Sequence, residues 1–431
     1  MKNISKFLFL MMLAMAAVTF VGCGPDEEPV VVDPPINSCE HSGFITADET
    51  WSASCIHVLK DRVIVKEGVT LTIEPGTIIK GEAGAGVNAS ALVIARGAKI
   101  NAAGTAANPI IFTSIADEIA LGEKVGANLD EASAKGFWGG VIILGAAPTS
   151  PSTGATEQIE GIPASVPEGN YGGSNAADNS GVFTYVSIRF GGANIGEGNE
   201  INGLTLGGVG NGTTINHVEV LGNVDDGIEC FGGTVNIDHA LVMYQGDDAF
   251  DIDQAYSGTI NNFIYIAGAD SDHGLEIDGP EGSENAGGKF TLQNGSLKGN
   301  PVQSEFADFR SNAQGTVDNL YFFGFNSAAD VELDDDKTSA NYTSGALVLT
   351  NLKFNSTAWS LTDGEPDGGT TTWALVTDIF ADKAPAGDAA AADIKFAANG
   401  NALVTTKTGG ANKSEFTGWS LADAKGLLSD F

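Results

Sequence analysis

The second half of the chain repeats one pattern of residues, and this repeat restricts the possible folds more than any other feature. In each copy, a pair of acidic or polar residues precedes a short strand-like run, a glycine-containing turn and a second run. One polar residue marks the same point in every copy: His217, His239, Asn262, Asn294, Asn319 and Asn351. Their separations are 22, 23, 32, 25 and 32 residues. Repeats of this length stack as the coils of a solenoid, with insertions in the turns.

The runs between the turns are typical of β-strands. They are short, rich in β-branched residues and bounded by Gly, Asn and Pro, as in "ALVIARGAKINAAGTAANPIIFTS". We find no convincing helical periodicity before the C-terminal end, where "LADAKGLL" is consistent with a short helix. We therefore predict an all-β fold, a parallel β-helix with coils of about 22–25 residues and a short C-terminal cap over its last coil.

The column of marker residues has a structural explanation. Stacked Asn and His side chains at one turn can hydrogen-bond along the coil axis and satisfy buried backbone groups. We expect this role for His217 and His239, and His41 and His57 lie in the N-terminal segment. His273 is therefore the histidine that remains as a candidate for chemistry.

The N-terminus predicts export and lipid attachment. Residues 1–22 have a short basic start and an apolar run, which is typical of a signal peptide. The segment "FVGC" resembles a bacterial lipobox, with Cys23 as the acylated residue, and the following acids resemble a surface-export signal of Bacteroidetes lipoproteins. Residues 23–37 read as an acidic, Pro-rich tether, residues 38–400 as the β-helix and residues 401–431 as the cap. We expect an outer-membrane protein that faces the cell exterior and contacts the membrane only through its lipid anchor.

Three cysteines follow the lipidated one. An exported chain permits a disulfide between Cys39 and Cys55. Cys230 lies within an alternating apolar run, so we expect a buried free thiol. The spacing of the cysteines does not suggest a zinc site or a catalytic cysteine.

The charge of the chain excludes some partners. Asp and Glu number 55 against 21 Lys and Arg, which gives a formal net charge of −34. Such a surface repels nucleic acid and anionic lipid head groups, and it suits cations or neutral ligands.

Side chains alternate across a strand, so the inward apolar residues identify the outward ones. We expect one outward row of Thr205, Glu229, Asp251, Glu276, Arg310 and Glu332, and beside it a row of Gly207, Phe231, Asp253, Asp278, Asn312 and Asp334. Neighbouring coils lie about 4.8 Å apart, so the quartet Asp251, Asp253, Glu276 and Asp278 requires raised pKa values, the nearby Arg310 or a bound cation. Ca²⁺ suits several carboxylates on a rigid scaffold.

The acidic pairs Asp225–Asp226 and Asp247–Asp248 lie at the turn that enters each strand. Two interpretations remain open. Aspartate accepts hydrogen bonds from backbone N–H groups in turns of this kind. The same side chains could face a ligand instead.

Two resemblances add to this interpretation. The phrases "LTIEPGTIIKG", "WGGVIILG", "NEINGLTLGGVGNGTTINHVEV" and "DDGIECFGG" resemble a family of Bacteroidetes β-helix surface lipoproteins. This resemblance covers roughly residues 50–430 and implies a right-handed β-helix at the outer membrane, with no established activity. "DDGIE" and "DHGLEIDG" resemble motifs of polygalacturonases, although Asp272 stands where that family has Gly. That resemblance implies Asp226 or Asp248 as general acid or base, with His273 orienting them.

Three functions are compatible with these features. We rank first the binding of an extracellular polysaccharide or surface partner, without catalysis, through Glu229, Phe231 and Asp247 on an acidic face that holds Ca²⁺ at the quartet. In this hypothesis Phe231 offers a stacking surface, and the insertion that contains Tyr171 walls the site. The second is a polysaccharide lyase or glycoside hydrolase that uses Asp226, Asp248 and His273, with Arg310 as the base of a lyase. The third is a structural adhesin or surface-coat protein with Ca²⁺ as a bridging ion. Whether the chain is an enzyme stays open at this point.

Overall fold

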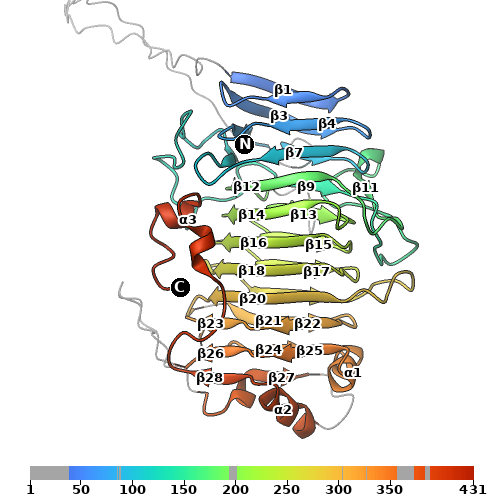
Figure 1. Cartoon of the computed structure of the whole chain (residues 1–431), viewed down its shortest axis with the longest axis vertical. Coiled ribbons are helices and arrows are strands. Elements are labelled where there is room, and N and C mark those ends of the chain that lie inside the picture. Colours follow the sequence, from blue (N-terminus) through green and yellow to red (C-terminus); the bar gives the residue numbers. More distant parts are fainter. Residues whose placement is uncertain are drawn as a thin grey trace, which may run out of the picture. The chain divides into compact units, whose positions relative to one another are not determined.

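The chain folds as a right-handed parallel β-helix (Figure 1). The computed structural model describes residues 38–84, 86, 89–193, 201–302, 304–326, 328–356, 373–383 and 389–431. The expected signal peptide, Cys23 and the tether lie outside these residues. Within them, 26 strands form one hydrogen-bonded system in which the strand pairs are parallel. The fold predicted from the repeat is therefore confirmed.

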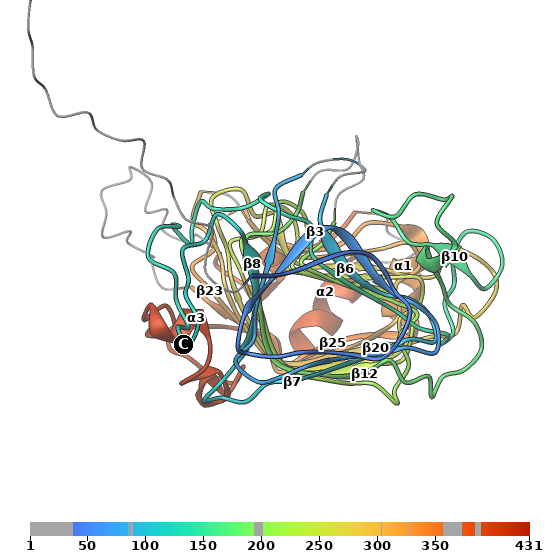
Figure 2. The same ribbon diagram turned by 90° about the horizontal axis from the view of Figure 1, so that it is seen from above.

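The coils stack into three faces, and their outlines overlay in the view from above (Figure 2). The first face contains β6 (Ala91–Ile94), β9 (Val141–Leu144), β13 (Leu204–Gly207), β15 (Ile228–Phe231), β17 (Phe250–Asp253), β19 (His273–Asp278), β21 (Glu305–Arg310), β24 (Val331–Leu333) and β27 (Phe380–Asp382). The second face contains β2 (Glu49–Trp51), β4 (Thr70–Ile73), β7 (Lys99–Ala103), β22 (Gly315–Asp318) and β25 (Leu347–Thr350). The third face contains β5 (Ile78–Gly81), β8 (Ile110–Ser114), β23 (Tyr321–Phe323), β26 (Lys353–Asn355) and β28 (Ala402–Val404).

Seven long strands bend and contribute to two faces each. The second and third faces share β12 (Gly181–Arg189), β14 (Thr214–Leu221), β16 (Asn236–Met243), β18 (Thr259–Ile266) and β20 (Phe290–Lys298). The third and first faces share β1 (Ser38–Ile45) and β3 (Ile56–Val65).

The marker residues form the corner between the second and third faces. Each of the six has a left-handed backbone, with φ between 54° and 61°. Asparagine tolerates this conformation better than other residues with a β-carbon, which explains why it dominates the column. The side chains also stack as expected: Asn319 Nδ2 donates to Asn294 Oδ1 at 2.7 Å, and the rings of His217 and His239 are 4.4 Å apart.

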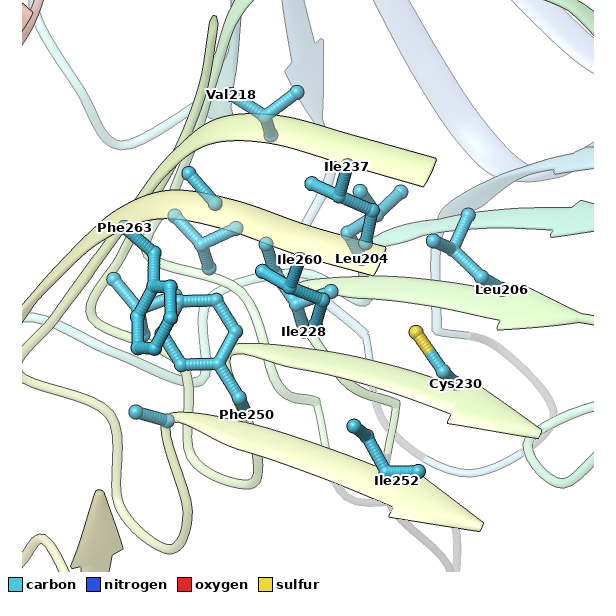
Figure 3. Close-up of a cluster of buried hydrophobic side chains, with 14 of the residues drawn as sticks. Leu204, Leu206, Val218, Ile228, Cys230, Ile237, Phe250, Ile252, Ile260 and Phe263 are labelled. Carbon is cyan, nitrogen blue, oxygen red and sulfur yellow. The ribbon is translucent and has the colours of Figure 1, made fainter. Parts of the chain in front are cut away.

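The core lies between the three faces. Figure 3 shows Leu204, Ile228, Phe250 and other side chains of the first face pointing toward side chains of β14, β16 and β18. The labelled residues are all at most 1% exposed: Leu204, Leu206, Val218, Ile228, Cys230, Ile237, Phe250, Ile252, Ile260 and Phe263. Cys230 is a buried free thiol, as expected. The inward and outward assignment of the acidic strands therefore holds.

Two helices were missed from the sequence. The helix α1 (Asp336–Ser344) begins after Asp335, whose side chain accepts hydrogen bonds from two backbone N–H groups of its first turn. The helix α2 (Ala389–Ala398) is alanine-rich, and Ala has the highest helix propensity. Phe396 of α2 is fully buried and stacks 4.5 Å from Phe380 of β27. Both signals, the N-cap and the alanine run, were present in the sequence.

The C-terminal segment differs from the cap that the sequence predicted. The last strand, β28, pairs with β26 beyond the expected boundary at residue 400. The chain then runs back along the third face, so that α3 (Leu421–Ala424) lies beside β12 and β14 in Figure 1. Backbone N–H groups of this segment donate to Asn262 Oδ1 at 2.6 Å and to Ser296 Oγ at 2.8 Å. The segment therefore covers a flank of the β-helix, and α2 packs against the last coil instead.

Candidate functional site

The outward acids of the first face form one row across successive coils. The strand register places Thr205, Glu229, Asp251, Glu276, Asp308 and Glu332 side by side. We call the outward side of β15, β17, β19 and β21 the acidic face. The expected place of Arg310 in this row was wrong, because β21 begins at Glu305, opposite His273. Arg310 instead pairs with Asp278 in the second row, where Asn312 was expected.

Arg310 compensates one half of the expected metal quartet. Its Nε lies 2.7 Å from Asp278 Oδ2, and its Nη2 forms an ion pair with Glu276. Asp308 Oδ2 lies 3.8 Å from Nη1. These contacts make Glu276 and Asp278 an ion-paired group rather than two open metal ligands. Asp251 and Asp253, the other half of the quartet, lie one coil away.

Three other carboxylates meet deeper in the acidic face. Asp226, Glu229 and Asp251 each place one oxygen within 4.8 Å of the other two. Asp226 and Glu229 are 7% and 6% exposed. The side-chain amide of Asn202 donates to Glu229, whereas Asp251 Oδ1 is buried and has no hydrogen-bond partner. We call these three residues the buried acid cluster.

Burial raises the pKa of all three carboxyl groups in the buried acid cluster. Neighbouring acids raise the pKa values further, chiefly Asp225 beside Asp226, Asp251 beside Glu229 and Asp253 beside Asp251. Two oxygens bound to one Ca²⁺ at about 2.4 Å can be at most about 4.8 Å apart. The arrangement therefore fits a Ca²⁺ ion one coil away from the quartet that the sequence suggested.

The second acid of each pair supports the turns. Asn202 Oδ1 accepts from the backbone N–H of Asp226 at 3.2 Å, and Asp226 Oδ1 accepts from that of Asp248 at 2.9 Å. Asp248 Oδ1 accepts from the N–H of His273 at 2.6 Å. One side chain per coil thus holds the backbone of the next coil, so the turn interpretation applies to Asp226 and Asp248. The first acid of the second pair, Asp247, is exposed.

His273 is held as a cation. Burial disfavours its charged form, but the hydrogen bond and the charge of Asp248 outweigh this and raise the pKa of His273 to about 9. Its Nδ1 lies 3.0 Å from Asp248 Oδ1. A histidine that is protonated at neutral pH cannot act there as a general base.

The comparison with known families agrees with this architecture. Residues 43–420 match the model of the pectate-lyase-like β-helix domain. The chain belongs to this family. No curated protein and no solved structure matches the chain.

In this β-helix domain, Phe231 does not offer the open stacking surface that the sequence suggested. It is 9% exposed and packs 5.9 Å from the ring of Tyr171. Tyr171 belongs to β11 (Asn170–Tyr171), which pairs with β10 (Glu157–Gln158) in an insertion beside the acidic face. The insertion therefore covers Phe231, and the expected aromatic contact with a ligand was wrong.

Two residues of the site were missed from the sequence. Asn202 lies one coil before Asp226, and the 24-residue offset between Thr205 and Glu229 leads to it. Gln254 is 2% exposed, and its Nε2 donates to Tyr171 Oη and Glu157 Oε2, both at 2.9 Å. No sequence pattern connects Gln254 to an insertion that is more than 80 residues away.

The acidic face predicts an unusual dependence of stability on pH. Burial raises the pKa of Asp253 to about 8, of Asp308 to about 7 and of Asp278 to about 6. In an unfolded chain these groups titrate near about 3.9. The folded chain therefore binds more protons between these pH values, and its stability falls as the pH rises from about 4 to about 8. The charged His273 contributes stability below its ordinary pKa that is lost as the pH rises through about 9.

We therefore expect the melting temperature, measured by calorimetry in a chelator, to be at least ~5 °C higher at pH 5.5 than at pH 8.5. Excess Ca²⁺ should reduce this difference, because the ion replaces protons on the carboxylates. A melting temperature that rises with pH in the chelator would contradict the assigned pKa directions.

Proposed function

We propose that the acidic face binds an extracellular acidic polysaccharide through a Ca²⁺ ion held by Asp226, Glu229 and Asp251. The observation that carries this proposal is Asp251 Oδ1, a buried carboxylate oxygen without a partner, beside two buried carboxylates. An unpaired buried charge is costly, and a bound cation removes that cost. The ligand set contains only oxygens, which Ca²⁺ prefers.

The neighbouring side chains suit a carbohydrate. Asp253, Asp278 and Arg310 are partly exposed and lie next to the buried acid cluster on adjacent coils. Carboxylates accept hydrogen bonds from sugar hydroxyls, and Arg donates to acidic sugar groups. Without a cation the face would repel a polyanion. Ca²⁺ keeps coordination positions beyond the three protein ligands, which carboxylates of the polysaccharide can occupy. The family's description, which relates this fold to that of pectate lyases, supports a carbohydrate ligand.

Binding is favoured over catalysis because the candidate catalytic groups are engaged. Asp226 and Asp248 accept hydrogen bonds from the backbone of the next coil. His273 is paired with Asp248, and Arg310 is paired with Glu276 and Asp278. A general acid or base requires a group that can exchange a proton with the substrate. We therefore propose a binding protein rather than a lyase or hydrolase.

We further propose that the β-helix is presented outside the cell by a lipid on Cys23. This proposal rests on the signal peptide, the lipobox and the acidic residues that follow Cys23. Among the described residues, no helix is both long and apolar enough to cross a membrane.

Affinity gel electrophoresis tests the proposed function. We expect polygalacturonate in the gel to retard the chain in the presence of Ca²⁺ and not in the presence of a chelator. A neutral β-glucan should not retard it in either condition. Ca²⁺ binding without retardation by any polysaccharide would contradict the carbohydrate proposal and favour the structural adhesin. Formation of unsaturated or reducing ends would contradict the non-catalytic assignment.

A further inference from the structure

The first coil contains two copies of a Cys-x-His pattern that play no part in the acidic face. They are Cys39-Glu40-His41 on β1 and Cys55-Ile56-His57 at the start of β3. The two strands are parallel and place Cys39 opposite His57. Because side chains two residues apart share one side of a strand, both cysteines and both histidines gather at one place. Cys39 and Cys55 form the disulfide that the sequence predicted.

We propose that reduction of this disulfide converts the cluster into a Zn²⁺ site with the thiolates of Cys39 and Cys55 and with His57 Nε2 as ligands. A dithiol supplies two electrons and two protons, the Cys39–Cys55 bond breaks, and the dithiol becomes a disulfide. The two new thiols lose their protons to solvent as they bind Zn²⁺.

The geometry of the cluster fits a tetrahedral ion. One ligand atom from each of Cys39, Cys55 and His57 lies within 4.8 Å of the other two. Cys55 Sγ lies 3.5 Å from His57 Nε2. With Zn–S near about 2.3 Å and Zn–N near about 2.05 Å, a tetrahedral angle separates the two atoms by about 3.5 Å. This edge of the site already exists, and the two sulfurs need only move apart once their bond is broken.

The surroundings of His57 match those of a metal-bound histidine. His57 Nδ1 lies 2.8 Å from His41 Nε2, and His41 Nδ1 lies 3.7 Å from Glu49 Oε1. Zinc on Nε2 places the proton of His57 on Nδ1, from which it is donated to His41, and His41 then donates toward Glu49. A histidine ligand is commonly oriented by such a partner on its other nitrogen. The ring of Trp51 lies 4.2 Å from that of His41 and 5.1 Å from that of His57.

The site is accessible to an ion from solvent. A surface cavity of about 540 Å³ is lined by these residues: Cys39, His41, Glu49, Trp51, Cys55 and His57. Three protein ligands leave one position, which water can occupy. Soft thiolates with imidazole select Zn²⁺ over Ca²⁺, so this site and the acidic face take different ions.

Titration of the full chain with Co²⁺ and then Zn²⁺ tests the proposal. The chain is reduced with dithiothreitol and desalted without oxygen. We expect one Co²⁺ per chain with thiolate-to-metal absorption, displaced by one Zn²⁺, and no such absorption in the oxidised chain. His41→Gln should lower the affinity for Zn²⁺ about 10- to 100-fold.

Two variants address the ligands. Cys55→Ser should abolish the absorption, whereas the matched variant Cys230→Ser, which removes the free thiol in the core, should keep it. His57→Gln leaves both cysteines in place and should weaken binding even if Cys55→Ser fails to fold. Absence of binding by the reduced wild-type chain, or unchanged binding by His57→Gln, would overturn the proposal.

Discussion

Replacing Asp251 with asparagine should lower the affinity of the chain for Ca²⁺ at least about 100-fold in isothermal titration calorimetry. The substitution removes one of three anionic ligands and replaces the carboxylate whose Oδ1 is buried without a partner. The backbone hydrogen bonds that hold the coils together use Asp226 and Asp248 instead, so the fold should remain intact. Without Ca²⁺ the variant should be at least as stable as the wild type at pH 8, because one like charge is removed beside Asp253.

The matched control is Asp334→Asn. Asp334 is an exposed acid after β24, away from the buried acid cluster, and the substitution changes the net charge equally. Its affinity for Ca²⁺ should be that of the wild type. Equal losses in both variants would show that Ca²⁺ responds only to the overall charge of the chain.

Replacing Glu219 with alanine should destabilise the chain by about 3–5 kcal/mol. Glu219 is fully buried on β14, where its carboxylate accepts hydrogen bonds from Ser187 Oγ at 2.6 Å and from the backbone N–H groups of Leu421 and Ala422 at 3.0 Å. Arg189, also fully buried, donates from Nε to the same serine oxygen at 2.8 Å. The alanine variant leaves a buried guanidinium without a nearby carboxylate and leaves the start of α3 without acceptors.

Denaturant unfolding measures this loss, and hydrogen exchange locates it. Amides of residues 411–431 should exchange faster in Glu219→Ala, while those of β15 and β17 should not change. Glu219→Gln keeps one acceptor oxygen and the volume of the side chain, so it should lose less stability. Unchanged protection of residues 411–431 would contradict the anchoring role of Glu219.

Much of the fold could be predicted because a solenoid encodes its core locally. Ile228 and Cys230 alternate with outward residues in every copy, and the marker column fixes where each copy begins. The same column could have corrected the register error at Arg310. Asn262 and Asn294 are 32 residues apart, and 276 + 32 = 308, which is the residue that pairs with Glu276. The insertion in this coil lies between β19 and β20, so it shifts both columns equally.

The site was predicted less completely, because it depends on contacts between distant parts of the chain. The burial of Phe231 is due to an insertion that is about 60 residues earlier, and the C-terminal segment reaches Glu219 across 202 residues. No periodicity of the repeat encodes either contact. The role of Arg310 also required the actual register, since a shift of two residues moves its guanidinium from Glu332 toward Asp278.

The most direct test of a Ca²⁺-dependent carbohydrate site compares the wild type with Asp251→Asn in one polygalacturonate gel. With Ca²⁺ present, the wild type should be retarded, and Asp251→Asn should migrate as it does without polysaccharide. Asp334→Asn, run beside them, should be retarded like the wild type. Equal retardation of wild type and Asp251→Asn would show that the polysaccharide binds elsewhere and would contradict the account of the acidic face.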